Sequence, residues 1–179
     1  HNIIGDRIEA FSYLCVGAIS RGTIIVRNIN PIFLSSELNV LQKLGCTVKT
    51  ENNLISIKSK NSLKPLKITT GPYPKFATDN MPALLAVLST VNGKSEINET
   101  IFSNRFMAAP ELSRMGAIIK IKKNKAIILG QKKLIGADCI SSDLRTTFSI
   151  ILGALAAKGI SQVQRVYHGL RGYYNLIGK

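Results

Sequence analysis

The sequence predicts an α/β domain made of repeated units of strand, helix, strand, helix, strand and strand, two of them complete and one truncated. One order of features occurs three times: an aspartate, an apolar helical segment, a glycine, and a run rich in β-forming residues. Two of the units continue into a second helix that stops at a glycine, a common helix C-terminus. The units span about residues 1–62, 63–133 and 134–179.

The first unit opens with Asp6 and an apolar helix that runs to Ile19. A strand, a second helix stopped by Gly45, and a hairpin follow, at residues 23–27, 35–44, 47–50 and 54–58. Asn52 and Asn53 supply the hairpin turn, and apolar and polar residues alternate along its strands. No strand is predicted ahead of the first helix.

The second unit adds a leading strand and repeats the pattern from Asp79. Its strands are predicted at residues 66–70, 94–98, 117–121 and 126–129, with the hairpin turn near Asn124. Its helices are predicted at residues 83–91 and 104–115, and Gly116 stops the second.

The third unit has a strand at 137–141, an apolar helix at 148–157 after Asp143, and a strand at 160–165. It stops at Lys179 inside its predicted second helix. The apolar helices of the second and third units lack a polar face, so we expect both to be buried on nearly all sides, with the strands outside them.

Composition narrows the class of protein. Hydrophobic residues make up 45% of the chain, which predicts a globular domain. No apolar run reaches the roughly 18 residues of a membrane span, and residues 1–9 are too polar for a signal peptide, so no membrane partner is expected. Cys15, Cys46 and Cys139 are widely spaced, which favours buried, reduced thiols in a cytoplasmic protein. Without a CxxC pair or a histidine cluster, no metal site is predicted.

The formal net charge of +14 has three interpretations. A phosphate-rich small substrate or a nucleic acid would be attracted by such a field. The third is codon bias, because the lysines are scattered and Ile and Asn are also abundant. No basic stripe with interleaved aromatic residues occurs, so no nucleic-acid partner is expected.

Local motifs add a resemblance. Five occur in one order along nearly the whole chain: Asp6-Arg7-Ile8-Glu9-Ala10; Phe76-Ala77-Thr78-Asp79; Glu99-Thr100-Ile101-Phe102-Ser103-Asn104-Arg105-Phe106-Met107 with Pro110-Glu111-Leu112 and Arg114-Met115-Gly116-Ala117; Ser142-Asp143-Leu144-Arg145; and Tyr167-His168 with Arg171-Gly172-Tyr173. With the repeat, they resemble the enolpyruvyl transferases, whose domains are inside-out α/β structures. The motifs themselves are similar to signatures of the UDP-N-acetylglucosamine 1-carboxyvinyltransferases.

This resemblance implies transfer of the enolpyruvyl group of phosphoenolpyruvate to the 3′-hydroxyl of UDP-N-acetylglucosamine, without a cofactor. It covers only the second portion of the family's chain. The first portion carries a lysine-asparagine pair and a mobile loop with a reactive cysteine. We therefore expect a missing N-terminal half to be the chain's partner, and we expect the chain alone to be inactive.

The resemblance also implies roles for particular residues. Asp79 would be the catalytic acid or base at the sugar hydroxyl, and Arg171 would bind phosphoenolpyruvate. The remaining substrate-binding candidates are Asp6, Ile101, Phe102, Arg105, Asp143 and Arg145. For Phe102 the alternative is core packing, and for Arg105 it is a solvated position on a helix.

The residues themselves allow simpler interpretations. Asp6, Asp79 and Asp143 each precede an apolar helix, where an aspartate is usually an N-cap. Arg7 and Arg145 lie in first helical turns, where a cation opposes the helix dipole. A bound anion would relieve that conflict, and so would pairing with the neighbouring aspartate.

The sequence also departs from the family pattern. Asn80-Met81-Pro82-Ala83 stands where Met-Gln-Ala-Gln is usual, Leu170 replaces an aspartate, and Phe11-Ser12 replaces Gly-Thr. Losing polar groups near a substrate lowers activity, so a degenerate homologue acting as a basic binding or structural module is the alternative.

Overall fold

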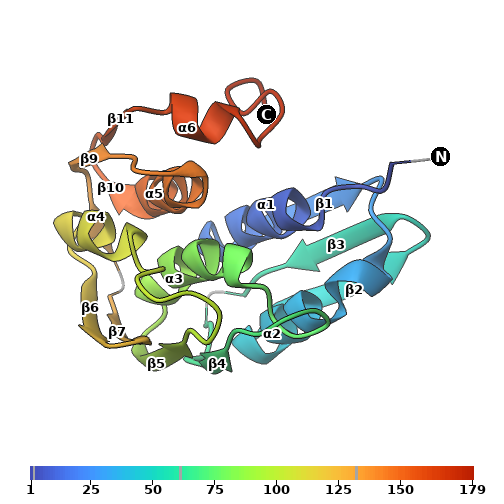
Figure 1. The fold of residues 1–179 in the computed structure, drawn as a ribbon, viewed down its shortest axis with the longest axis horizontal. Coiled ribbons are helices and arrows are strands. Elements are labelled where there is room, and N and C mark those ends of the chain that lie inside the picture. The colour runs from blue at the N-terminus through green and yellow to red at the C-terminus, as the bar shows by residue number, and fades with distance from the viewer. Residues whose placement is uncertain (2, 61, 132) are drawn as a thin grey trace.

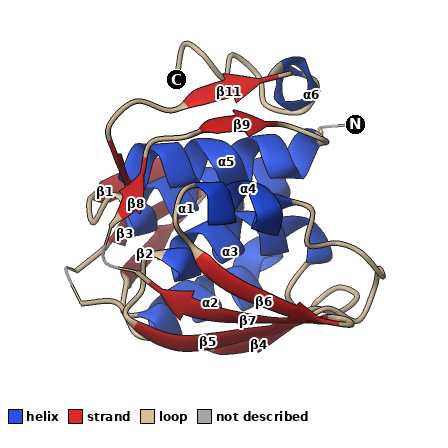
Figure 2. Ribbon diagram, turned by 90° about the vertical axis from the view of Figure 1, so that its left-hand side faces the viewer, coloured by secondary structure: helices blue, strands red, loops and turns tan. Residues whose placement is uncertain are grey.

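The computed structural model describes residues 1, 3–60, 62–131 and 133–179. Three helices pack against one another in the centre of the molecule: α1 (Arg7–Ile19), α3 (Met81–Ser89) and α5 (Leu144–Ala156). The strands lie outside them, with β9 and β11 on one side and the sheet that contains β5 on the opposite side (Figures 1 and 2). The predicted inside-out α/β arrangement is therefore confirmed.

The first unit forms a three-stranded antiparallel sheet in the order β1-β3-β2. Its elements are β1 (Thr23–Arg27), the 3₁₀ turn η1 (Pro31–Leu34), α2 (Ser35–Leu44), β2 (Thr47–Glu51) and β3 (Leu54–Lys58). Gly45 ends α2 with a φ of 109°, the left-handed conformation that glycine adopts most readily.

The second unit forms a four-stranded sheet in the order β4-β5-β7-β6. Its elements are β4 (Lys67–Thr69), the 3₁₀ turn η2 (Thr78–Asn80), β5 (Gly93–Asn98), α4 (Ala108–Arg114), β6 (Ile118–Lys122) and β7 (Lys125–Gly130). Only β4 and β5 are parallel. The predicted start of α4 at residue 104 is wrong, because Asn104 has a φ of 65° and the chain turns there before the helix begins.

The third unit contributes two parallel strand pairs, β8 with β10 and β9 with β11. Its elements are β8 (Leu134–Ile135), β9 (Asp138–Ile140), β10 (Ala157–Lys158), β11 (Gln162–Gln164) and α6 (Tyr167–Leu170). The sequence did not predict β8 or β10. The expected second helix is reduced to α6, and turns follow it to the end of the chain.

Burial agrees with the prediction for α3 and only partly for α5. Every residue of α3 is buried. In α5, however, Leu155 is 57% exposed and Ile151 is half-buried. The strand pairs β8-β10 and β9-β11 are too short to cover this face of α5. Among the described residues, no hairpin of the third unit covers the face either.

The three cysteines lie in the core as free thiols, as predicted. Burial raises the pKa of Cys15, Cys46 and Cys139. Across the described residues, no helix combines the length and the apolar character that crossing a bilayer requires.

Candidate active site

The three aspartates do not hold equivalent positions. Asp6 and Asp143 are the N-caps of α1 and α5, and their carboxylates accept hydrogen bonds from the first backbone N–H groups of those helices. In the second unit the same position, an extended residue before the first helical turn, belongs to Ala77. Asp79 lies two residues further on, inside η2, and it caps no helix. The N-cap interpretation is thus correct for two aspartates and wrong for Asp79.

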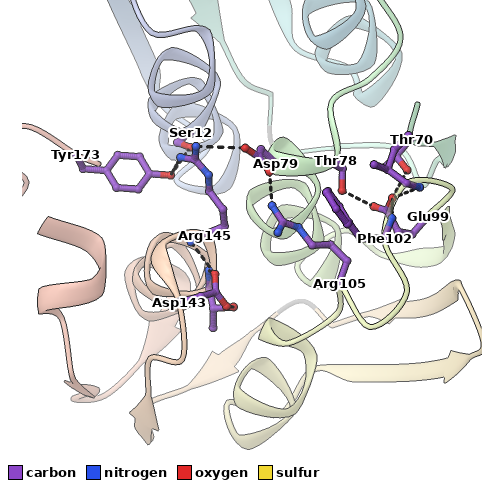
Figure 3. A network of polar contacts seen from close by, with 12 residues as sticks. Ser12, Thr70, Thr78, Asp79, Glu99, Phe102, Arg105, Asp143, Arg145 and Tyr173 are labelled. Atoms are coloured by element: carbon purple, nitrogen blue, oxygen red, sulfur yellow. Dashed lines mark hydrogen bonds and ion pairs between the residues drawn. The ribbon is translucent and has the colours of Figure 1, made fainter. Parts of the chain in front are cut away.

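Asp79 lies between two guanidinium groups (Figure 3). Arg105 Nη2 donates to Asp79 Oδ1, and Arg145 Nη2 lies 3.4 Å from Asp79 Oδ2. The Asp79 side chain remains 39% exposed, so a ligand can reach this carboxylate. The three charged groups come from η2, the segment before α4 and the first turn of α5.

Neither first-turn arginine pairs with the aspartate of its own helix. Arg145 reaches Asp79 and also lies 3.4 Å from the Tyr173 hydroxyl. Arg7 lies 4.0 Å from Glu37 and stacks over the Tyr73 ring at 5.2 Å. The pairing alternative is therefore wrong for both arginines.

Tyr173 lies beside Arg145, and its hydroxyl contacts the Arg145 guanidinium. Its ring is buried and stacks on Phe148 at a centroid distance of 4.4 Å, and its hydroxyl lies 3.0 Å from Ser12 Oγ. Burial raises the pKa of Tyr173, although the contacts with Ser12 and Arg145 oppose this effect. The sequence did not predict its polar contacts. Its place beside Arg171-Gly172 in a quoted motif was the available signal.

Asp143 uses its carboxylate as a cap. It accepts hydrogen bonds from the backbone N–H groups of Arg145 and Thr146, at 2.8 and 2.9 Å, and from two hydroxyls. Burial tends to raise its pKa, but these hydrogen bonds to the ionised form outweigh burial and hold the pKa below its usual range. Asp143 also lines a pocket of about 290 Å³, together with Pro82, Phe102, Ser103, Asn104, Arg105, Met107 and Thr146.

Residues 100–104, in the segment between β5 and α4, are exposed to solvent. Ile101 is 39% and Phe102 is 52% exposed, so the alternative that Phe102 packs in the core is wrong. The Arg105 guanidinium lies 5.5 Å from the centre of the Phe102 ring. Arg105 is ion-paired with Asp79 and is only 26% exposed, so the solvated alternative is also wrong.

The structure brings together Asp79, Phe102, Arg105, Asp143 and Arg145, with Ile101 beside Phe102. Asp6 caps α1 through Ile8 and Glu9 and contacts none of them through its side chain. Arg171 is exposed at the end of α6 and forms no side-chain hydrogen bond or ion pair within the described ranges.

Two acidic residues beside this group were not predicted. Glu99 and Glu37 are buried, and both accept hydrogen bonds from the segment that contains Asp79. Glu99 heads a motif that the sequence singled out. No grouping of three or more His, Cys, Asp and Glu side chains suited to a metal ion occurs in the part of the chain that the structure describes.

Solved structures identify the fold. The enolpyruvyl transferase NikO from Streptomyces tendae matches 98% of this chain with a TM-score of 0.88 at 24% identity, over 42% of the NikO chain. An EPSP synthase from Acinetobacter baumannii matches 91% of the chain with a TM-score of 0.71 at 20% identity, over 39% of its own chain. The fold is that of the enolpyruvyl transferases.

The sequence identifies the family. The family described as EPSP synthase (3-phosphoshikimate 1-carboxyvinyltransferase) matches residues 1–179, and the chain belongs to this family. Among curated relatives, the UDP-N-acetylglucosamine 1-carboxyvinyltransferase of Campylobacter lari is 45% identical over 174 residues, which are 97% of this chain. The enzyme of that name from Thermotoga maritima is 40% identical over 179 residues. The chain spans 42% of the length of each of these two relatives.

Proposed function

We propose that this chain supplies the acid/base group and part of the anion-binding surface of a UDP-N-acetylglucosamine 1-carboxyvinyltransferase, an enzyme of peptidoglycan synthesis in the cytoplasm. The observation that carries the proposal is Asp79, a reachable carboxylate between Arg105 and Arg145 that does not cap its helix. Relatives of that name at 40% to 45% identity support this choice of substrate.

The reaction needs an acid/base group and cations. The hydroxyl oxygen of the sugar forms a bond to C2 of phosphoenolpyruvate as the hydroxyl loses its proton, the C2–C3 π bond breaks, and C3 takes up a proton. In the second stage the bond from C2 to the phosphate oxygen breaks, phosphate leaves with the electron pair, and C3 loses a proton. In this proposal Asp79 accepts the hydroxyl proton. Arg105 and Arg145 are placed to neutralise the phosphate or carboxylate that enters beside it.

The other predicted residues take binding roles in this proposal. Ile101 and Phe102 offer an exposed apolar edge for the sugar nucleotide, and Asp143 lines the pocket behind them. Arg171 would bind phosphoenolpyruvate, and Asp6 remains a candidate ligand. The remaining portion of the enzyme, which the relatives contain, would close over this surface. The net charge of +14 suits two anionic substrates.

Three of the departures from the family pattern, Asn80, Pro82 and Ser12, are compatible with this surface. Asn80 is buried and donates to Glu37 at 3.0 Å, and Pro82 lies in the first turn of α3, where a missing N–H costs nothing. Ser12 gains a partner in Tyr173. These contacts favour a working site over a degenerate module.

Phosphate release by the complete enzyme tests the proposal. We expect turnover of phosphoenolpyruvate with UDP-N-acetylglucosamine and none with 3-phosphoshikimate, the acceptor in the family's description. Turnover with 3-phosphoshikimate alone would assign the chain to the other branch of the family. Turnover with neither acceptor would favour the binding module.

A further inference from the structure

Two buried acidic residues hold the segment that carries Asp79. Glu37 and Glu99 are 2% and 1% exposed, and no other acidic side chain is buried to this degree in the described ranges. They come from different units, Glu37 from α2 and Glu99 from the position directly after β5. Both accept hydrogen bonds from residues 77–80, so the buried carboxylates are concentrated on a single turn.

Glu99 joins this turn to the segment before α4. Its Oε2 accepts from the Thr78 hydroxyl at 2.8 Å (Figure 3). Its Oε1 accepts from the Thr70 hydroxyl at 2.8 Å and from the backbone N–H groups of Ile101 and Phe102 at 2.7 and 3.3 Å. One side chain therefore fixes the residue before Asp79 relative to the two residues that are proposed to line the sugar-nucleotide site.

Glu37 holds the same turn through two other residues. Its Oε1 accepts from the backbone N–H of Ala77 at 3.1 Å and from Asn80 Nδ2 at 3.0 Å. The neighbours of Asp79 are thus fixed by hydrogen bonds. Ala77 and Asn80 donate to Glu37, and Thr78 donates to Glu99. The Asp79 carboxylate itself stays free to face Arg105 and Arg145.

The repeat shows that Glu99 is specific to the second unit. Asn28 and Arg165 occupy the corresponding positions after β1 and β11, and both have left-handed φ values of 62° and 57°. Glu99 is not among the residues with positive φ. The unit that carries Asp79 is therefore the one that replaces a left-handed turn residue with a buried hydrogen-bonded carboxylate.

Energetics argue against an incidental role. A buried carboxylate is costly unless donors satisfy it. Glu99 forms no ion pair with any described lysine or arginine, so its four hydrogen bonds compensate for its burial. These donors include Thr78 in the Asp79 turn and the backbone of Ile101 and Phe102. The Glu99 carboxylate is therefore fully hydrogen-bonded only when the turn and residues 101–102 are both in position.

We propose that Glu99, with Glu37 opposite it, is a positioning residue that sets the distance between Asp79 and the sugar-nucleotide surface at Ile101 and Phe102. This inference rests on the proposed function. Glu99 does not touch the reacting atoms. Its removal should shift Asp79 relative to the bound sugar hydroxyl, and displacements on the order of 1 Å cost about 100-fold in rate.

The test uses three variants of the complete enzyme. Glu99→Leu removes all four acceptors, and kcat/KM for UDP-N-acetylglucosamine should fall roughly 10- to 100-fold, while KM for phosphoenolpyruvate changes less than about twofold. Glu99→Gln should restore most of that loss, because its amide oxygen can accept from residues 70, 101 and 102 and its amide nitrogen can donate to the Thr78 hydroxyl. Thr78→Val removes a single hydrogen bond and covers the case in which Glu99→Leu fails to fold.

Thr90→Val is the matched control. Thr90 is a buried threonine at the opposite end of α3, and its hydroxyl donates to Val87 O at 2.8 Å and accepts from Arg21 Nη2 at 3.3 Å. It should lose stability as Thr78→Val does and keep the wild-type kinetic constants. The inference is overturned if folded Glu99→Leu or Thr78→Val keeps wild-type kcat/KM, or if both KM values rise together. A wild-type enzyme without turnover of UDP-N-acetylglucosamine refutes the proposed function instead, and the inference with it.

Discussion

Asp79 differs from its two counterparts in what its carboxylate contacts. The carboxylates of Asp6 and Asp143 are engaged by backbone N–H groups, whereas that of Asp79 faces two arginines and solvent. A short sequence motif cannot distinguish these cases, because all three aspartates precede an apolar helix. Asp79 lies two residues beyond the N-cap position because the 3₁₀ turn η2 precedes α3, and the sequence did not predict this turn.

Replacing Asp79 by Asn in the complete enzyme tests its role. The amide is nearly the same size and cannot take up a proton at neutral pH. We expect kcat to fall by about 10²- to 10⁴-fold, the usual contribution of a positioned acid/base group. The melting temperature should change little, because Asp79 caps nothing and its ion pairs are partly exposed.

Asp6→Asn is the internal control for that measurement. It changes the same functional group at a residue whose side chain contacts only α1. Asn caps about as well as Asp, so we expect a much milder effect on rate. If Asp79→Asn loses stability and keeps its rate, Asp79 is structural.

Asp143 gives a prediction about pH. Its pKa is lower in the folded chain than in the unfolded chain, so the unfolded state binds a proton first as pH falls. The resulting stabilisation is present above the unfolded pKa and is lost as pH falls through the folded pKa. Asp143→Asn should keep most of the neutral-pH stability and flatten this acid-side decline. Urea unfolding of both chains between pH 7 and pH 3 measures the difference, and parallel pH curves would contradict it.

At the level of elements, prediction succeeds where local signals agree. The bounds of β1, α2 and β3 match residue for residue, because alternation defines the strands and Gly45 ends the helix. The short strands β8 and β10 have only two residues each and no alternation to detect. The exposed end of α5 could not be predicted either, because Leu155 has the same apolar character whether or not a sheet covers it.

The close approach of β7 to α3 gives a prediction about packing. A Cβ placed on Gly130 would lie 1.8 Å from Val91 O and 2.8 Å from Leu88 O, both backbone atoms that cannot move aside. We expect Gly130→Ala to lower the free energy of unfolding by at least about 1–3 kcal/mol, the usual cost of overpacking. Gly22→Ala is the matched control, since the nearest atom there is the movable Ser20 Oγ at 3.1 Å. Equal denaturant midpoints for the two variants would contradict the close approach of β7 to α3.

At the scale of the whole molecule, three related units build one core and only one of them carries the acid/base candidate. α1, α3 and α5 pack together, and the network around Asp79 joins Ser12 of α1, Arg145 of α5 and Asp79 in η2, the turn that precedes α3. The repeat could be predicted from the sequence, and the resemblance supplied most of the site. The hydrogen bonds from Asn80 to Glu37, from Thr78 to Glu99 and between Ser12 and Tyr173 could not be predicted, because they join residues that are 21 to 161 positions apart.

The last prediction concerns this chain by itself. Its candidate site is open: Asp79 is 39% exposed, and Phe102 is 52% exposed. Enolpyruvyl transfer requires two substrates held together and water kept out, and a one-sided surface provides neither. We therefore expect no release of phosphate above background when residues 1–179 are mixed with phosphoenolpyruvate and UDP-N-acetylglucosamine. Adding the remaining portion of the enzyme as a separate chain should restore measurable turnover if the two parts associate, and Asp79→Asn in this chain should abolish that recovery. Turnover by residues 1–179 at an ordinary rate of about 1–10³ per second would show that the chain forms a closed site by itself.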